Sequence, residues 1–152
     1  MGGCDSPAEL NIPQYPHTDF MDVKTIADIV FKLYLYADST KLIHYTTEKN
    51  HMHELCDEVR DTIVDFADEL AEQSFGYYGK PNFYQLPKLN SLDIRETENL
   101  SELIDYSTEI VDYLHSEFSK EKKMSGAVSL IDDFKGAMSK LKFRCTFDKV
   151  AE

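Results

Sequence analysis

Cysteine is scarce in this chain of 152 residues. The three cysteines, Cys4, Cys56 and Cys145, are widely spaced and odd in number, which argues against a disulfide framework and favours a reducing environment. No apolar run reaches the roughly 18 residues that suggest a membrane span, and no signal-peptide pattern appears. The sequence therefore predicts a cytoplasmic protein that does not cross a membrane.

Basic residues are also few, with 16 Lys and Arg against 28 Asp and Glu, and the formal net charge is −12. An acidic surface repels phosphate backbones, so this balance argues against nucleic-acid binding and favours cations as partners. Hydrophobic residues make up 42% and charged residues 29% of the chain. This composition and length are typical of one globular domain with a core of its own.

The first residues read MGGCDS, which fits the M-G-x-x-x-[ST] pattern for myristoylation, with Cys4 beside it as an acceptor for a second lipid. A lipid-anchored scaffold is therefore one interpretation of the chain. The other is an extended arm without a lipid, because Pro7, Pro13 and Pro16 interrupt this segment. We favour the arm, since the lipidation pattern is short and common.

Four segments carry apolar residues at the spacing of an α-helix. Asn99 and Glu102 form a capping-box pattern at the start of the third. We expect one apolar stripe of each helix to face a common core. The expected helices cover about residues 20–46, 50–75, 99–119 and 125–143. The expected core stripes are Ile26, Val30, Leu33, Ala37, Thr40 and His44; Met52, Cys56, Val59, Ile63, Phe66 and Leu70; Leu100, Leu103, Ser107, Ile110, Leu114 and Phe118; and Val128, Ile131, Phe134, Met138 and Leu141.

A long stretch separates the second and third expected helices. It reads GYYGKPNFYQLPKLN, and its Gly and Pro residues among aromatics predict a structured crossover. Four helices with a long central crossover predict an all-α fold of the ferritin-like kind. We expect an extended N-terminal arm over residues 1–19, a ferritin-like four-helix bundle over residues 20–143 and a C-terminal tail over residues 144–152.

The first expected helix has a second apolar stripe, formed by Phe31, Leu35 and Leu42, on its opposite side. A helix that is apolar on two sides is expected to pack on two sides, against its own bundle and against a neighbouring subunit. Which of the two stripes meets the neighbour stays open at this point. If the Phe31 stripe does, His44 points into the bundle instead.

Acids and a histidine share one side of the second expected helix. At 100° per residue, His53, Asp57, Asp68 and Glu72 fall within about 100° of one another and lie roughly 150–160° from the apolar stripe. They are therefore expected to face away from the bundle's own core. A row of acids is most often a solvated surface. With His44, however, these residues offer three carboxylates and two imidazoles, which suit Fe(II), Mn(II) or Zn(II) without a thiolate.

A di-iron site inside one bundle would need two Glu-x-x-His pairs on facing helices. Glu48 and His51 have this spacing, and Asp112 and His115 form a looser Asp-x-x-His pair, but neither has a counterpart. The predicted site therefore does not lie within a single bundle.

The spacing of His53, Asp57, Asp68 and Glu72, with His44 before them, resembles that of the DNA-protection-during-starvation (Dps) branch of the ferritin superfamily, over roughly residues 20–143. That family carries a His near the end of the first helix, a His-x3-Asp at the start of the second, and an Asp-x3-Glu eleven residues after that Asp. The HYTT at residues 44–47 and the G-x-Y-G at residues 76–79 are also similar to the small Dps-like proteins of tailed phages. The matching residues here are His44, His53, Asp57, Asp68 and Glu72.

The resemblance implies a ferroxidase centre shared across a two-fold dimer interface. Asp68 and Glu72 of one subunit and His44 of the other would hold the tighter iron ion, and His53 and Asp57 would support the weaker one. Peroxide would be the preferred oxidant, with oxygen as the alternative, and zinc or manganese are alternative metals. The ferric product would be stored in a hollow homo-oligomeric shell, for which a dodecamer is the form that the resemblance suggests.

Three features differ from the family pattern. His44 and His53 are nine residues apart, where cellular members have twelve, and Tyr45 stands where the family has Trp. Tyr45 is therefore the candidate catalytic residue, as a trap for a radical. The chain has no Trp, and its first 20 residues contain no Lys or Arg, so DNA coating is not expected.

The alternative function is a ferritin-like structural, virion or assembly protein that keeps the bundle and the dimer without oxidising iron, because fold alone does not settle function. A phage-encoded protein of this kind would work in the host cytoplasm or in the virion. The five candidate ligands favour the ferroxidase, and the missing Trp and the altered histidine spacing favour the structural protein.

Overall fold

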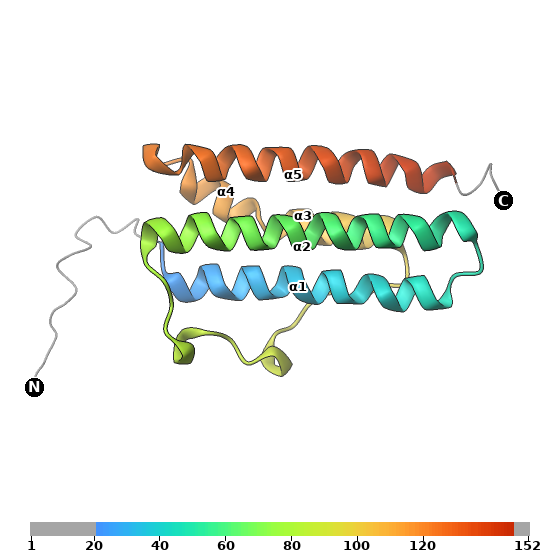
Figure 1. Ribbon diagram of the computed structural model, residues 1–152, viewed down its shortest axis with the longest axis horizontal. Helices are drawn as coiled ribbons and strands as arrows, with labels where there is room; N and C mark the ends of the chain where they lie inside the picture. Colours follow the sequence, from blue (N-terminus) through green and yellow to red (C-terminus); the bar gives the residue numbers. More distant parts are fainter. Residues whose placement is uncertain (1–20, 148–152) are drawn as a thin grey trace, which may run out of the picture.

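The computed structural model describes residues 21–147, and this part of the chain is all-helical and contains no strand. The helices lie side by side in a bundle (Figure 1). The expected arm over residues 1–19 and residues 148–152 lie outside the described residues. The α-helices are α1 (Val23–Thr46), α2 (Asn50–Tyr78), α3 (Leu100–Glu109), α4 (Asp112–Phe118) and α5 (Ser125–Arg144), and the short 3-10 helices are η2 (Phe83–Gln85), η3 (Leu89–Ser91), η4 (Lys122–Met124) and η5 (Cys145–Phe147).

The chain direction reverses between α1 and α2 but not between α2 and α3 (Figure 1). The segment between α2 and α3, residues 79–99, therefore runs back along the bundle and contains η2 and η3. Gly79 ends α2 at φ 105°, a conformation that side chains with a Cβ rarely adopt. Asn82 and Gln85 then form a reciprocal capping box that holds η2.

Local hydrogen bonds explain where two helices begin. Asp22 caps α1 by accepting a hydrogen bond from the backbone N–H of Lys24 at 3.1 Å. Asn99 caps α3 by accepting one from the N–H of Glu102 at 3.0 Å, as the sequence predicted. The Glu102 side chain does not complete the capping box, because it accepts a hydrogen bond from the Thr97 hydroxyl at 2.6 Å instead.

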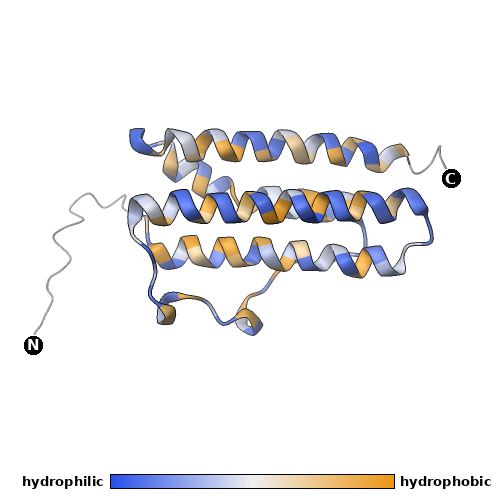
Figure 2. Ribbon diagram, viewed as in Figure 1, coloured by the Kyte–Doolittle hydropathy of each residue, from blue (hydrophilic) through white to orange (hydrophobic). Residues whose placement is uncertain are grey.

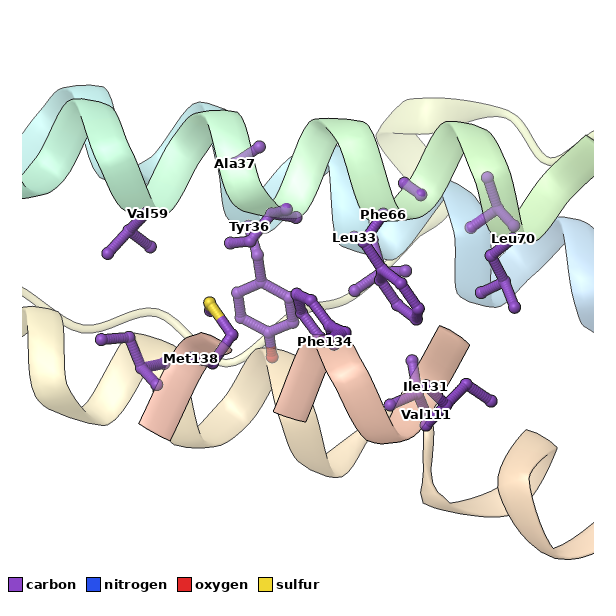
Figure 3. Packing of buried hydrophobic residues seen from close by; sticks show 14 of the residues in the cluster. Leu33, Tyr36, Ala37, Val59, Phe66, Leu70, Val111, Ile131, Phe134 and Met138 are labelled. Carbon is purple, nitrogen blue, oxygen red and sulfur yellow. The ribbon is translucent and has the colours of Figure 1, made fainter. Parts of the chain in front are cut away.

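The core follows the predicted apolar stripes of all four segments. Most stripe residues are buried, and Phe66 of α2 stacks on Phe134 of α5 with ring centroids 3.9 Å apart. Figure 3 shows Leu33, Phe66 and Phe134 between the helices. The predicted residues that are only half-buried are His44, Met52, Ile110 and Val128.

The prediction of one continuous helix over residues 99–119 is wrong. The chain breaks at Ile110 and Val111 into α3 and α4, and Val111 is buried in place of the predicted Ile110. Two features favour this break. The hydroxyls of Ser107 and Thr108 donate to backbone carbonyls three residues earlier, each at 3.0 Å, which bends helices. Ile110 and Val111 are adjacent β-branched residues with weaker helix propensity.

Polar and apolar residues alternate around the helices (Figure 2). This pattern gives each helix one side for the core and one side for water. Among the helices of residues 21–147, none combines the length and the apolarity that a bilayer span requires.

We expect Phe134→Ala to lower the free energy of unfolding by about 3–5 kcal/mol, because it removes the ring that stacks on Phe66 and leaves a cavity. The matched control is Phe143→Ala on the same helix, whose side chain is 63% exposed. This control should change the free energy by less than about 0.5 kcal/mol. Urea unfolding followed by circular dichroism measures both values, and equal losses would contradict the core described above.

Candidate metal centre

The acids of α2 lie on its outer side, opposite the buried stripe. Asp57, Asp61, Asp68 and Glu72 are all exposed, whereas Val59, Ile63 and Leu70 of the same helix are completely buried. The helical angles predicted this orientation. The row is therefore available to a partner or to cations but not to the bundle's own core.

One group of predicted ligands gathers where α1 ends and α2 begins. The connection between these helices, residues 47–49, is short enough to bring the last turn of α1 beside the first turns of α2. The Nδ1 atom of His44 lies 3.2 Å from Oδ1 of Asp57, and the rings of His44 and His53 are 4.8 Å apart between centroids. The structure thus brings together three of the five predicted ligands.

His44 carries an unsatisfied nitrogen atom in this group. Its Nδ1 atom is buried and makes no hydrogen bond, although the Asp57 carboxylate is near. At 3.2 Å this nitrogen forms an ion pair with Asp57 when the imidazole is protonated, although the contact does not have the geometry of a hydrogen bond. An imidazole nitrogen beside a carboxylate is a pair of ligand types that suits a metal ion, although this group alone does not form a complete site within one chain.

The second group, Asp68 and Glu72, lies three turns further along α2. Asp57 and Asp68 are eleven residues apart, which corresponds to a rise of about 16 Å. Protein ligands bind metal ions at about 2 Å, so one ion cannot be bound by both groups of the same chain. Within residues 21–147, no three His, Cys, Asp or Glu side chains of a single chain are close enough to hold a metal ion.

Two side chains near these groups were missed by sequence reasoning. Lys41 places its Nζ atom 3.4 Å from Oδ1 of Asp57. Tyr34 lies near the second group: burial raises its pKa, and the negative charges of Asp68 and Glu72 raise it further. Lys41 and Tyr34 are seven residues apart on α1, and this spacing was the signal that both lie on the same side of the helix.

Tyr45, the predicted catalytic residue, is 74% exposed. Its ring meets the ring of His44 edge-on at 5.2 Å between centroids. Tyr45 thus contacts one predicted ligand from the solvent side.

The remaining histidine pairs of the sequence have other partners. His51 makes a hydrogen bond to the backbone oxygen of Arg144 at 3.0 Å, and His115 lies 2.9 Å from a carboxylate oxygen of Asp132. Asp112 forms an ion pair with Lys135. These contacts connect α5 with α2 and with α4.

Cys56 lies on the buried side of α2 and not on the side of the acids. This residue is completely buried in the core, and burial raises the pKa of its thiol to about 11. Cys56 therefore stays protonated near neutral pH and is a poor metal ligand.

A groove of about 1330 Å³ lies elsewhere on the described residues. It is bounded by the second half of α1, residues 89–101 and the start of η5, and it contains none of the five predicted ligands. Leu35 and Leu42 of the second apolar stripe line this groove. That stripe therefore lies away from the acids of α2, and His44 lies beside them.

Comparison with known proteins gives no match to this chain among family models, curated proteins or solved structures.

Because Asp68 and Glu72 are exposed, we expect Asp68→Ala and Glu72→Ala to change the free energy of unfolding of the metal-free protein by less than about 0.5 kcal/mol. Urea unfolding in the presence of a chelator measures this change, with Phe134→Ala as the destabilised reference. A loss of about 2 kcal/mol or more would mean that these acids serve the fold rather than a binding site.

Proposed function

We propose that this protein is a Dps-like mini-ferritin that binds and oxidises Fe(II) at a di-iron site shared between two copies of the chain. The observation that carries the proposal is the division of the five ligands into two incomplete groups on one outward face of the α1–α2 pair. His44, His53 and Asp57 form one group, and Asp68 and Glu72 form the other. Neither group is a complete metal site by itself. The first group supplies two imidazoles and one carboxylate, and the second supplies two further carboxylates.

A single two-fold axis between two copies of the chain would bring the first ligand group of each copy to the second ligand group of the other. The position on α2 midway between Asp57 and Asp68 is also midway between His53 and Glu72. If two antiparallel copies of α2 cross there, Asp57 of each copy faces Asp68 of the other, and His53 faces Glu72. A two-fold interface uses the same patch on both subunits, so two equivalent sites form together.

The course of the chain supports a ferritin-like version of the four-helix bundle. Such bundles have one long connection between helices that run in the same direction. Residues 79–99 are such a long connection, between α2 and α3. The expected N-terminal arm remains part of the same proposal.

Iron would be the substrate of this site. Asp68, Glu72 and His44 of the other copy would hold the tighter Fe(II), and His53 and Asp57 would hold the weaker one. The ammonium group of Lys41, 3.4 Å from Asp57, competes for that carboxylate and is a physical reason for the weaker binding. Two Fe(II) ions lose one electron each, and hydrogen peroxide accepts both electrons and two protons to give two water molecules.

The proposal includes storage of the ferric product in a homo-oligomeric shell, with a dodecamer as the form to test by mass. Zinc and manganese are alternative metals. The acidic charge of −12 supports cations rather than DNA as partners.

The second candidate function is a structural, virion or assembly protein that shares the dimer but oxidises no iron. One observation favours it: Lys41 is already within ion-pair distance of Asp57, at 3.4 Å. The replacement of the family's Trp by Tyr45 also favours a structural protein.

We expect Fe(II) with hydrogen peroxide to produce the near-ultraviolet absorbance of carboxylate-bound Fe(III), and Glu72→Ala and His44→Ala to abolish it, because each removes a ligand of the tighter site. The matched control is Glu69→Ala, which removes an exposed glutamate from the same helix but outside the predicted set. Equal absorbance in all variants would favour the structural protein.

Mixing the two inactive variants tests whether the site is shared. A dimer of one Glu72→Ala chain and one His44→Ala chain contains one site with both mutations and one site with neither, so each mixed dimer should regain one of its two sites. Co-expressed chains with different tags, purified in sequence, supply the mixed dimer. If both ligands came from the same chain, mixing would restore no activity.

A further inference from the structure

The α2–α3 connection carries an exposed aromatic pair at η2, Phe83 and Tyr84, which we call the aromatic tip. Phe83 is 79% and Tyr84 is 92% exposed, and these are the two most exposed large hydrophobic side chains of residues 21–147. Their rings meet edge-on at 5.7 Å between centroids. Aromatic residues are enriched at the centres of protein interfaces, so a pair left in water indicates a surface that binds another molecule.

Hydrogen bonds hold the aromatic tip in one conformation. The Asn82 side chain accepts hydrogen bonds from the N–H groups of Tyr84 at 2.9 Å and Gln85 at 3.1 Å. The Gln85 side chain accepts one from the N–H of Asn82 at 2.8 Å. A segment that is ordered before it binds loses less entropy on binding. The aromatic tip is therefore suited to insert into a groove.

The groove between α1 and residues 89–101 offers an apolar lining for such rings. Leu35 and Leu42 line it from the second apolar stripe of α1, and Leu89 and Leu92 line it from the α2–α3 connection. Pockets of about 300–1000 Å³ hold drug-sized ligands, so a groove of about 1330 Å³ has room for two aromatic side chains. Neither ring of the aromatic tip lines the groove of its own chain.

The aromatic tip lies in a basic segment of an acidic protein. Residues 73–92 contain no Asp or Glu, although the whole chain has a net charge of −12. Lys80 and Lys88 lie on either side of the tip. Both lysines are exposed, and neither forms an ion pair within residues 21–147. The segment therefore presents two unpaired positive charges next to the aromatic rings.

The groove has the opposite charge. Asp38, Glu96 and Glu98 line it, and these exposed acids form no ion pair with any other residue that the structure describes. Lys49 is the only basic residue among those that line the groove. Complementary charge steers two surfaces toward each other and sets their register. The groove thus matches the aromatic tip in both apolarity and charge.

Every copy of this chain carries both surfaces, and both lie on the part of the molecule where the α2–α3 connection runs along α1 (Figure 1). We propose that the aromatic tip of one copy docks into the groove of a second copy. The second apolar stripe of α1 predicts packing against a neighbouring subunit, and Leu35 and Leu42 of that stripe line the groove.

This contact is separate from the proposed metal centre. The groove contains none of the five predicted ligands, so the contact does not require metal binding. Together with a two-fold axis at the α1–α2 face, a second kind of contact would join dimers into a larger assembly, which a storage shell requires.

The first test is a double variant with Phe83→Ala and Tyr84→Ala. Sedimentation equilibrium in the presence of a chelator, which removes any contribution from the metal centre, should show self-association weakened at least about thirtyfold, as expected for aromatic residues at the centre of an interface. Because both side chains are exposed, the urea midpoint should not change. The matched control is Tyr113→Ala, a 52% exposed aromatic of α4 outside the tip and the groove. It should associate as the wild type does.

The second test changes the groove. Leu42 is 68% exposed, so Leu42→Lys should leave the fold intact, while the added charge repels the lysines beside the incoming tip. This variant alone should associate as weakly as the double variant. A mixture of the two should form larger species than either alone, because the tip of one variant and the groove of the other are unchanged.

A photo-crosslinker identifies what the aromatic tip contacts. Tyr84→p-benzoylphenylalanine, in a mixture of isotope-labelled and unlabelled chains, should give crosslinks between the two kinds of chain at residues 35–52 or 89–101, which line the groove. Crosslinks confined to one chain, or directed to residues 1–20, would mean that the tip has another partner and would overturn the proposal.

The outcomes separate this inference from the proposed function. A wild-type chain that stays monomeric in chelator, or a double variant that associates as strongly as the wild type, would show that the tip and the groove do not form this contact. If Glu72→Ala still loses iron oxidation in that case, the proposed function stands without the second contact. If no variant affects iron chemistry but the double variant dissociates, the contact stands and the proposed function fails.

Discussion

The antiparallel packing of α1 on α2 is the constraint on which the rest of this protein depends. The short connection at residues 47–49 sets which residues of the two helices meet, and the contacts of Asp57 with Lys41 and His44 mark that register. The apolar sides of both helices then form one core with α3, α4 and α5, while the polar sides form one outward face. A shift of this register by one turn would leave the core apolar but would move His44 away from Asp57.

The outward face has an unusual charge distribution. Arg60 is the only Lys or Arg of α2, and it lies 3.0 Å from Asp61, so the other acids of the row are not balanced from their own helix. In water this arrangement costs little, because exposed charges are screened. If the face is covered by a second copy, desolvation makes the unpaired acids costly unless cations neutralise them. Metal binding and dimer formation would then support each other.

The helical spacing of apolar residues was sufficient to predict most of the helices and the sides that they bury. The stripes of α1, α2 and α5 are buried largely as predicted, because alternating steps of three and four residues keep side chains on one side of a helix. It failed between α3 and α4, where the hydroxyl of Ser107 competes for a backbone carbonyl and Val111 rather than Ile110 faces the core. The same kind of hydroxyl bond, from Thr40 to the carbonyl of Ala37, leaves α1 continuous, so neither the apolar pattern nor these bonds alone set the position of the break.

For the site, the sequence by itself determined the outward direction of Asp57, Asp68 and Glu72, since angles along one helix follow from residue numbers. Only the tertiary structure decided which side chains of α1 stand beside them. Lys41 and Tyr34 come near these acids through the register of two helices, and His44 lies 3.2 Å from Asp57 for the same reason. That register results from the packing of whole side chains across the helix pair, which residue spacing within either helix does not specify.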